Sequence, residues 1–127
     1  MGHESAIPKP EEGRLFPNLR CLILISTNLS WKSLFKVIKA FEDVEELILC
    51  KNDLSDVENI DEGKFKCLEK LKFLNLEETK QVNFDGVRKF GVLPNLQKLI
   101  VSKNSIERIG RDFDGFENLK SLSIENN

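Results

Sequence analysis

The sequence contains little of what catalysis and metal binding require. It has a single histidine, at position 3, and its three cysteines, Cys21, Cys50 and Cys67, lie too far apart for a CxxC zinc motif. A serine or cysteine nucleophile needs a positioned histidine as its base. No GxGxxG or GxxxxGKS/T loop is present to hold a phosphate. We therefore expect no catalytic residue, no metal site and no cofactor, and we interpret the chain as a non-catalytic module.

Long apolar runs and a surplus of basic charge are also lacking. The longest apolar runs, such as residues 22–25, last only a few residues, whereas a membrane-spanning helix needs about 20. The 19 basic and 21 acidic side chains give a net charge of −2, which does not favour direct binding to nucleic acid. The N-terminus has no apolar core typical of a secretory signal. We expect no membrane partner and no direct nucleic-acid partner.

What the sequence does contain is a leucine-rich pattern that occurs five times. Each copy has apolar residues at its first, fourth and sixth positions. These residues are Leu19, Leu22 and Leu24; Val44, Leu47 and Leu49; Leu71, Leu74 and Leu76; Leu96, Leu99 and Val101; and Leu119, Leu122 and Ile124. Successive copies begin 25, 27, 25 and 23 residues apart, as in leucine-rich repeats. The pattern predicts an α/β fold: a right-handed leucine-rich repeat solenoid, or horseshoe segment, with short parallel strands and helical or irregular returns.

The ninth position of each copy carries an amide or a hydroxyl. Asn52, Asn104 and Asn127 take this position in three copies, and Thr27 and Thr79 take it in the other two. The ninth position follows the predicted strand, where backbone amides and carbonyls lose their partners in the sheet. An asparagine side chain both donates and accepts hydrogen bonds, so we expect it to satisfy backbone groups of adjacent turns. We assign these residues a structural role.

The segments between the predicted strands carry helical spacing. Ser30 is the predicted N-cap of a helix over 31–41, residues 62–70 predict a second, shorter helix, and 84–90 predict a third that ends at Gly91. The apolar residues that we expect these segments to bury are Leu34, Phe35, Ile38, Phe41, Phe65, Leu68, Val87 and Phe90, with Ile106, Ile109, Phe113 and Phe116 in a less regular stretch before the last copy.

The domain organisation follows from where the period begins and stops. Residues 1–14 have no period, and we expect a flexible leader that is partly not native. Residues 15–127 then form one leucine-rich repeat domain of about four to five units. The last copy stops at Asn127 without a polar capping unit, so we expect a domain that is truncated at its C-terminal end. The uncovered edge there predicts self-association.

The third, fifth and seventh positions of each copy point away from the core, onto the predicted concave face of the sheet. The side chains that we expect to bind a partner there are Phe73, Ile48, Ile100, Ile23, Ile25, Glu46, Glu77 and Lys98. An apolar patch on an open face more often marks a partner site than not, which we favour; the alternative is that a neighbouring domain of the same protein covers it. Phe73 is the expected anchor, because it is the only aromatic residue at the third, fifth or seventh positions and it lies in the central copy.

One stretch is more specific than the repeat itself. Thr27-Asn-Leu-Ser-Trp31, followed by the amphipathic run 32–41, resembles the leucine-rich repeats of the tubulin-folding cofactor E (tubulin-specific chaperone E) family. Residues 44–49 and 93–106 resemble two strand segments of that family, so the resemblance covers about 15–127. It implies a cytoplasmic protein that binds α-tubulin while the tubulin heterodimer is assembled or dismantled. That family also has a glycine-rich cytoskeleton-associated domain and a ubiquitin-like domain, and neither is recognisable here.

Two other functions are compatible with the same repeats. One is a leucine-rich adaptor of a nuclear or spliceosomal assembly, although the sequence has no basic stripe for direct contact with RNA. The other is the sensor repeats of an intracellular immune receptor. Flanking domains of the full-length protein would distinguish the three: glycine-rich and ubiquitin-like domains favour the chaperone, and an upstream nucleotide-binding domain favours the receptor.

Overall fold

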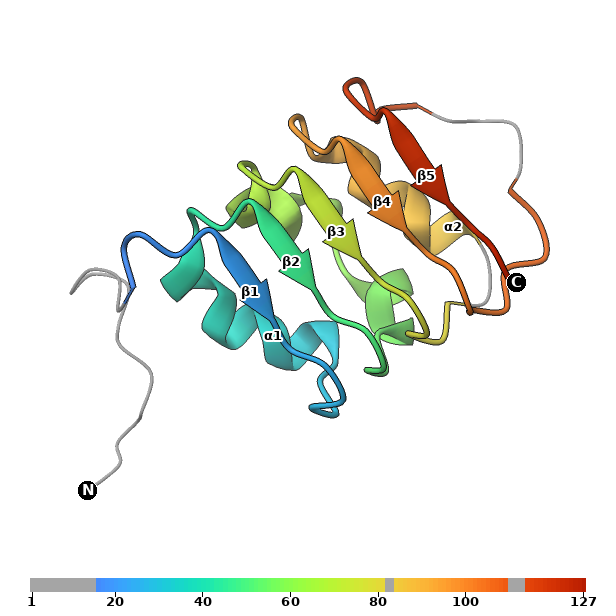
Figure 1. Cartoon of the computed structure of the whole chain (residues 1–127), viewed down its shortest axis with the longest axis horizontal. Coiled ribbons are helices and arrows are strands. Elements are labelled where there is room, and N and C mark those ends of the chain that lie inside the picture. The colour runs from blue at the N-terminus through green and yellow to red at the C-terminus, as the bar shows by residue number, and fades with distance from the viewer. Residues whose placement is uncertain (1–15, 82–83, 110–113) are drawn as a thin grey trace.

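A single parallel β-sheet organises the chain. The computed structural model describes residues 16–81, 84–109 and 114–127, so the predicted leader at 1–14 and Phe113 lie outside the described residues (Figure 1). The strands are β1 (Cys21–Ile23), β2 (Glu46–Ile48), β3 (Phe73–Asn75), β4 (Lys98–Ile100) and β5 (Ser121–Ser123). Their order in the sheet is the order in the chain, and every neighbouring pair is parallel. The predicted α/β class and the predicted short parallel strands are confirmed.

The register of the sheet is the one that the repeat predicts. The residues at the fourth position of each copy are aligned across it: Leu22, Leu47, Leu74, Leu99 and Leu122. In the three central strands these leucines are fully buried, as are the first- and sixth-position residues that flank them. Since side chains alternate along a strand, this register sends the third and fifth positions to the opposite face.

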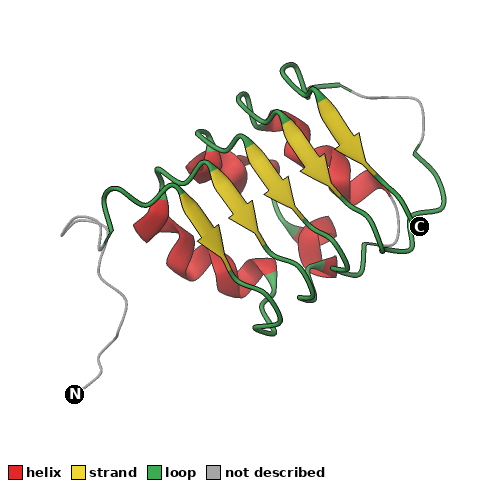
Figure 2. Ribbon diagram, viewed as in Figure 1, coloured by secondary structure: helices red, strands yellow, loops and turns green. Residues whose placement is uncertain are grey.

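The helical segments form a second layer on one face of the sheet, and the strands lie uncovered on the other (Figure 2). In this layer η denotes a 3₁₀-helix. The segments are α1 (Trp31–Ile38), η2 (Lys39–Phe41), η3 (Ser55–Asn59), η4 (Glu62–Leu68), α2 (Phe84–Val87) and η5 (Arg88–Val92). The first, second and third predicted helices are therefore present, mostly as short 3₁₀ turns, and η3 is one that the periodicity does not predict.

Two residues from different copies cap the N-terminus of α1. The Oγ atom of Ser30 accepts a hydrogen bond from the backbone N–H of Ser33 at 3.2 Å, as predicted. The carboxylate of Asp56, which lies in η3, accepts from the N–H groups of Trp31 and Lys32, both at 3.0 Å. A negative charge at this end of a helix is favourable, so η3 both covers and stabilises α1.

A cluster of aromatic rings joins successive returns within the core. Trp31 contacts Phe35 and Phe65, with ring centroids 5.6 Å and 5.4 Å apart. Phe65 and Phe90 are 5.0 Å apart, and Trp31 lies 5.5 Å from Phe90. Each copy therefore buries its apolar side chains against the copies beside it, because a strand of three residues cannot bury them alone.

Gly91 does not end the third helix, and that prediction is wrong. The segment η5 continues through Gly91 to Val92. Gly91 is instead a point of close approach, where its carbonyl accepts a hydrogen bond from the N–H of Phe116 at 3.0 Å. A Cβ atom on Gly91 would lie 2.9 Å from the backbone oxygen of Asp114, and one on Gly115, whose φ is +88°, would lie 2.5 Å from the Gly91 oxygen. Two glycines thus let the last return run directly against η5.

The predicted structural role of the ninth-position asparagines is confirmed. The side-chain oxygen of Asn52 accepts hydrogen bonds from the N–H groups of Thr27 and Leu29, each at 3.0 Å. Its amide group donates to the carbonyls of Leu24 and Leu49 at 2.7 Å and 3.0 Å. Asn104 and Asn127 form the equivalent bonds two and three copies further along.

In the copy that carries Thr79, a second residue supplies a hydrogen-bond donor to the preceding copy, and the sequence pattern does not predict it. The Thr79 hydroxyl donates to the Leu76 carbonyl at 2.7 Å, but it has no second donor for the preceding copy. The buried amide group of Gln81 supplies that donor and binds the Leu54 carbonyl at 3.0 Å. Threonine and glutamine together therefore supply the two side-chain donors that a single asparagine supplies in other copies.

The residue before the ninth position has a left-handed backbone in every copy. These residues are Ser26, Lys51, Glu78, Lys103 and Asn126, with φ between 55° and 61°. Residues other than glycine adopt this conformation at a cost, so its recurrence shows that one turn geometry is imposed at the end of each strand.

Candidate protein interface

The uncovered side of the sheet contains all the predicted partner-binding residues. We call the third-, fifth- and seventh-position residues of the first four copies the exposed sheet face. They are Cys21, Ile23, Ile25, Glu46, Ile48, Cys50, Phe73, Asn75, Glu77, Lys98, Ile100 and Ser102. The helical layer lies behind the strands in the view of Figure 1, so this face is turned towards the reader.

Strand pairing sets which of these side chains are neighbours. Along the third position, Phe73 is paired with Glu46 on β2 and with Lys98 on β4. The Lys98 Nζ atom lies 5.6 Å from the centroid of the Phe73 ring, a cation–π contact. Phe73 is therefore an aromatic ring between a carboxylate and an ammonium group, in the middle of the sheet.

The isoleucines do not form one continuous row. Ile23 and Ile48 are paired at the fifth position, but Asn75 of β3 separates Ile48 from Ile100. The side-chain oxygen of Asn75 accepts a hydrogen bond from the N–H of Glu77 at 3.0 Å. The structure thus gives one apolar area on β1 and β2 and a more polar area on β3 and β4.

Exposure varies along this face. Ile23 and Ile25 are 55% and 45% exposed, whereas Phe73, Ile48 and Ile100 are half-buried by their neighbours. The most accessible apolar surface therefore lies on β1, at the edge of the sheet. Because exposure depends on neighbouring strands, the repeat pattern alone does not predict this gradient.

The charged groups of this face are tied to nearby partners. Glu77 forms an ion pair with Lys103, with 3.5 Å between the two groups. Burial raises the pKa of the Cys50 thiol, and the Glu77 carboxylate raises it further. Burial and Glu46 raise the pKa of the Cys21 thiol in the same way. Thiols held in their protonated form are weak nucleophiles.

The described residues contain no group of three or more histidine, cysteine, aspartate or glutamate side chains able to hold a metal ion. Over the same residues, no helix has the length and apolar character needed to cross a membrane.

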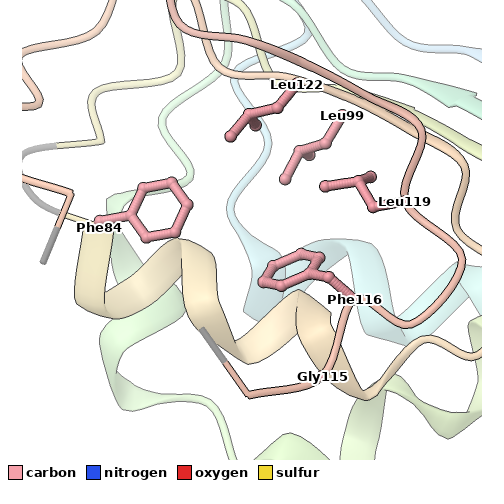
Figure 3. Close-up of a pocket in the computed structure, with 6 residues that line it drawn as sticks. All are labelled: Phe84, Leu99, Gly115, Phe116, Leu119 and Leu122. Carbon is pink, nitrogen blue, oxygen red and sulfur yellow. The ribbon is translucent and has the colours of Figure 1, made fainter. Parts of the chain in front are cut away.

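A separate apolar cavity of about 250 Å³ lies near the other edge of the sheet (Figure 3). Its lining residues are Phe84, Leu99, Gly115, Phe116, Leu119 and Leu122. Among the described residues no polar side chain lines it, so these residues do not supply the convergent polar groups that orient a small-molecule ligand. Leu122 is 37% exposed on β5, which is paired with β4 on one side only within the described sheet. This region is the C-terminal edge through which we expect self-association.

No family model matches the chain. The rat tubulin-specific chaperone cofactor E-like protein is 30% identical over 114 residues, which cover 86% of this chain and 26% of that protein. Tubulin-folding cofactor E of Arabidopsis thaliana is 29% identical over 79% of this chain. Tubulin-specific chaperone E of Xenopus laevis is 30% identical over 88% of it.

The chain spans about a quarter or less of the length of these relatives. The resemblance drawn from the residues around Trp31 is thus supported by similarity over most of the chain, to proteins that carry the cofactor E name.

Proposed function

We propose that this chain is the tubulin-binding segment of a tubulin-folding chaperone, built as a right-handed leucine-rich repeat solenoid. The fold part of the proposal is supported by features that recur in successive copies. These are the sequential parallel strands, the left-handed residue after each strand and the asparagine bonds between copies. Such a stack presents one face of its sheet as an extended binding surface.

The functional part depends above all on one observation, which is the similarity to cofactor E proteins over most of the chain. The names of those relatives refer to tubulin folding, and we extend that role to this chain as a non-catalytic, cytoplasmic binding module. α-Tubulin is the proposed partner, and no nucleic acid or membrane takes part.

The exposed sheet face is the proposed contact surface. Phe73 is the anchor because it lies centrally, is in cation–π contact with Lys98, and offers a large apolar area at low entropic cost. Ile23, Ile25 and Ile48 extend the apolar contact towards β1, and Ile100 extends it towards β4. Glu46, Glu77 and Lys98 supply polar contacts around it.

A titration of the purified chain against tubulin heterodimer tests this proposal. Phe73→Ala and Ile48→Asp should each weaken binding at least tenfold, which corresponds to ~1.4 kcal/mol. Val92→Ala is the matched control, because Val92 is an exposed apolar residue of η5 in the helical layer. It should leave the affinity unchanged.

Three outcomes would contradict the proposal. A wild-type chain that does not bind tubulin would remove its functional part. Loss of binding in Val92→Ala with retention in Phe73→Ala would move the contact to the helical layer. Tight binding to a spliceosomal protein or an immune effector, with none to tubulin, would favour one of the alternative functions.

A further inference from the structure

The helical layer contains a second surface feature that the proposed function does not use. A groove of about 820 Å³ runs between α1 with η2 on one side and η4 on the other. Its lining residues are Lys32, Phe35, Lys36, Lys39, Gly63, Lys64 and Cys67. The groove lies on the side of the molecule opposite the exposed sheet face, since α1 and η4 belong to the layer behind the strands (Figure 2).

The described residues that line this groove include four lysines and no carboxylate, so its walls are positively charged. Within the described part of the chain, none of its four lysines forms an ion pair, whereas Lys70, Lys72 and Lys80 each pair with a carboxylate. On α1 and its 3₁₀ extension, Lys32, Lys36 and Lys39 follow i, i+4, i+7 spacing, which places them along one side of the helix. Lys64 adds the opposite wall. Four unpaired ammonium groups around one hollow favour an anionic ligand.

The floor of the groove is an aromatic ring that cannot easily move. Phe35 is half-buried, and its ring lies 5.6 Å from that of Trp31 and 5.4 Å from that of Phe65. Both of these partners are fully buried. A rigid aromatic ring with one face open to water favours contact with an apolar group. The ligand should therefore carry an apolar group beside its negative charges.

Acidic groups around the groove limit which anion fits. Burial raises the pKa of the Cys67 thiol, and the nearby Glu42 carboxylate raises it further, while Lys39 lowers it. Asp61 and Glu62 precede Gly63 on the other wall. These carboxylates, and the overall charge of −2, would repel the continuous negative charge of a nucleic acid or a lipid surface. A peptide places separated charges between apolar side chains and avoids that repulsion.

We propose that this groove binds an acidic protein segment that carries a large apolar side chain. Carboxylates of the segment pair with Lys32, Lys36, Lys39 and Lys64, and the apolar side chain packs on Phe35. The inference is independent of which protein occupies the exposed sheet face.

Gly63 offers a way to block the groove without disturbing the fold. A Cβ atom at Gly63 would meet only the Asp61 carboxylate, at 3.9 Å, which is ordinary contact, and its backbone is not in the left-handed region. Gly63→Leu should therefore fold normally and fill part of the groove. Fluorescence of Trp31, the sole tryptophan and fully buried, reports whether each variant is folded.

The experiment is a fluorescence anisotropy titration of the whole chain with a short labelled peptide of glutamates around one phenylalanine. We expect saturable binding with a Kd of about 100 μM or tighter. Lys36→Gln with Lys39→Gln should weaken it at least fivefold, an effect of about 1 kcal/mol on the scale of tenfold per 1.4 kcal/mol. Gly63→Leu should weaken it similarly, as should replacing the peptide's phenylalanine with alanine.

The matched control is Lys51→Gln with Lys120→Gln, which removes the same charge from exposed lysines outside the groove. It should leave the affinity within twofold. Absence of saturable binding to the wild-type chain would overturn the proposal. So would equal losses in the control, or tighter binding to single-stranded DNA or to phosphatidylserine vesicles than to the peptide.

Discussion

Asn52→Ala tests the hydrogen bonds that join one copy to the next. Asn52 is buried, and its side-chain oxygen is the acceptor for the N–H groups of Thr27 and Leu29. Alanine would leave both donors without a partner in the protein, and a buried donor that loses its partner costs ~1–3 kcal/mol. The carbonyls of Leu24 and Leu49 would also lose the donor that the Asn52 amide group supplies. We therefore expect the free energy of unfolding to fall by about 2–4 kcal/mol.

Asn127→Ala is the control, because Asn127 forms the same kind of bonds but is exposed. Water can replace its side chain, so the loss should be below about 1 kcal/mol. Urea unfolding followed by the fluorescence of Trp31 measures both variants. Equal losses, or a greater loss in Asn127→Ala, would refute the argument that burial of these bonds sets their contribution.

The remaining predictions concern the core, a thiol and the sheet edge. Leu49→Ala, at a fully buried position, should lower the free energy of unfolding by ~2–5 kcal/mol, and Ile23→Ala, at an exposed one, by less than about 1 kcal/mol. Urea melts of both would show a reversed order if the register were wrong. Because the pKa of Cys50 is raised, less thiolate is present near pH 8, so iodoacetamide should modify it more slowly than free cysteine, and the difference should shrink at higher pH. Light scattering should show self-association that rises with concentration and that Leu122→Lys, on β5, suppresses. Scattering that does not change with concentration would contradict the last of these.

The sequence predicts the parts of the fold that repeat. The spacing of the leucines is sufficient for the register of all five strands, since a strand has a period of two and each copy restarts it. The role of Asn52 follows from the chemistry of its side chain. The hydrogen bonds of Gln81 and Asp56 cannot be predicted from the sequence, because each joins residues more than 20 positions apart and neither residue recurs in the other copies. Only the folded arrangement brings them to their partners.

For the two candidate surfaces too, the sequence predicts the residues that one element brings together but not the contacts between elements. Alternation along the strands predicts which residues share the exposed sheet face, but not that Phe73 is half-buried or that Asn75 interrupts the isoleucines. Helical spacing places Lys32, Lys36 and Lys39 together. It does not bring Gly63 and Lys64 opposite them, because that depends on how two successive returns pack.

The central claim is that the exposed sheet face binds α-tubulin. Its most direct test is a photo-crosslinking amino acid placed at Lys98, beside Phe73, and separately at Val92 in the helical layer. After irradiation with tubulin heterodimer, mass spectrometry identifies the crosslinked subunit. The account predicts crosslinks to α-tubulin from position 98 and none from position 92. Crosslinks from position 92 alone, or to β-tubulin alone, would contradict it.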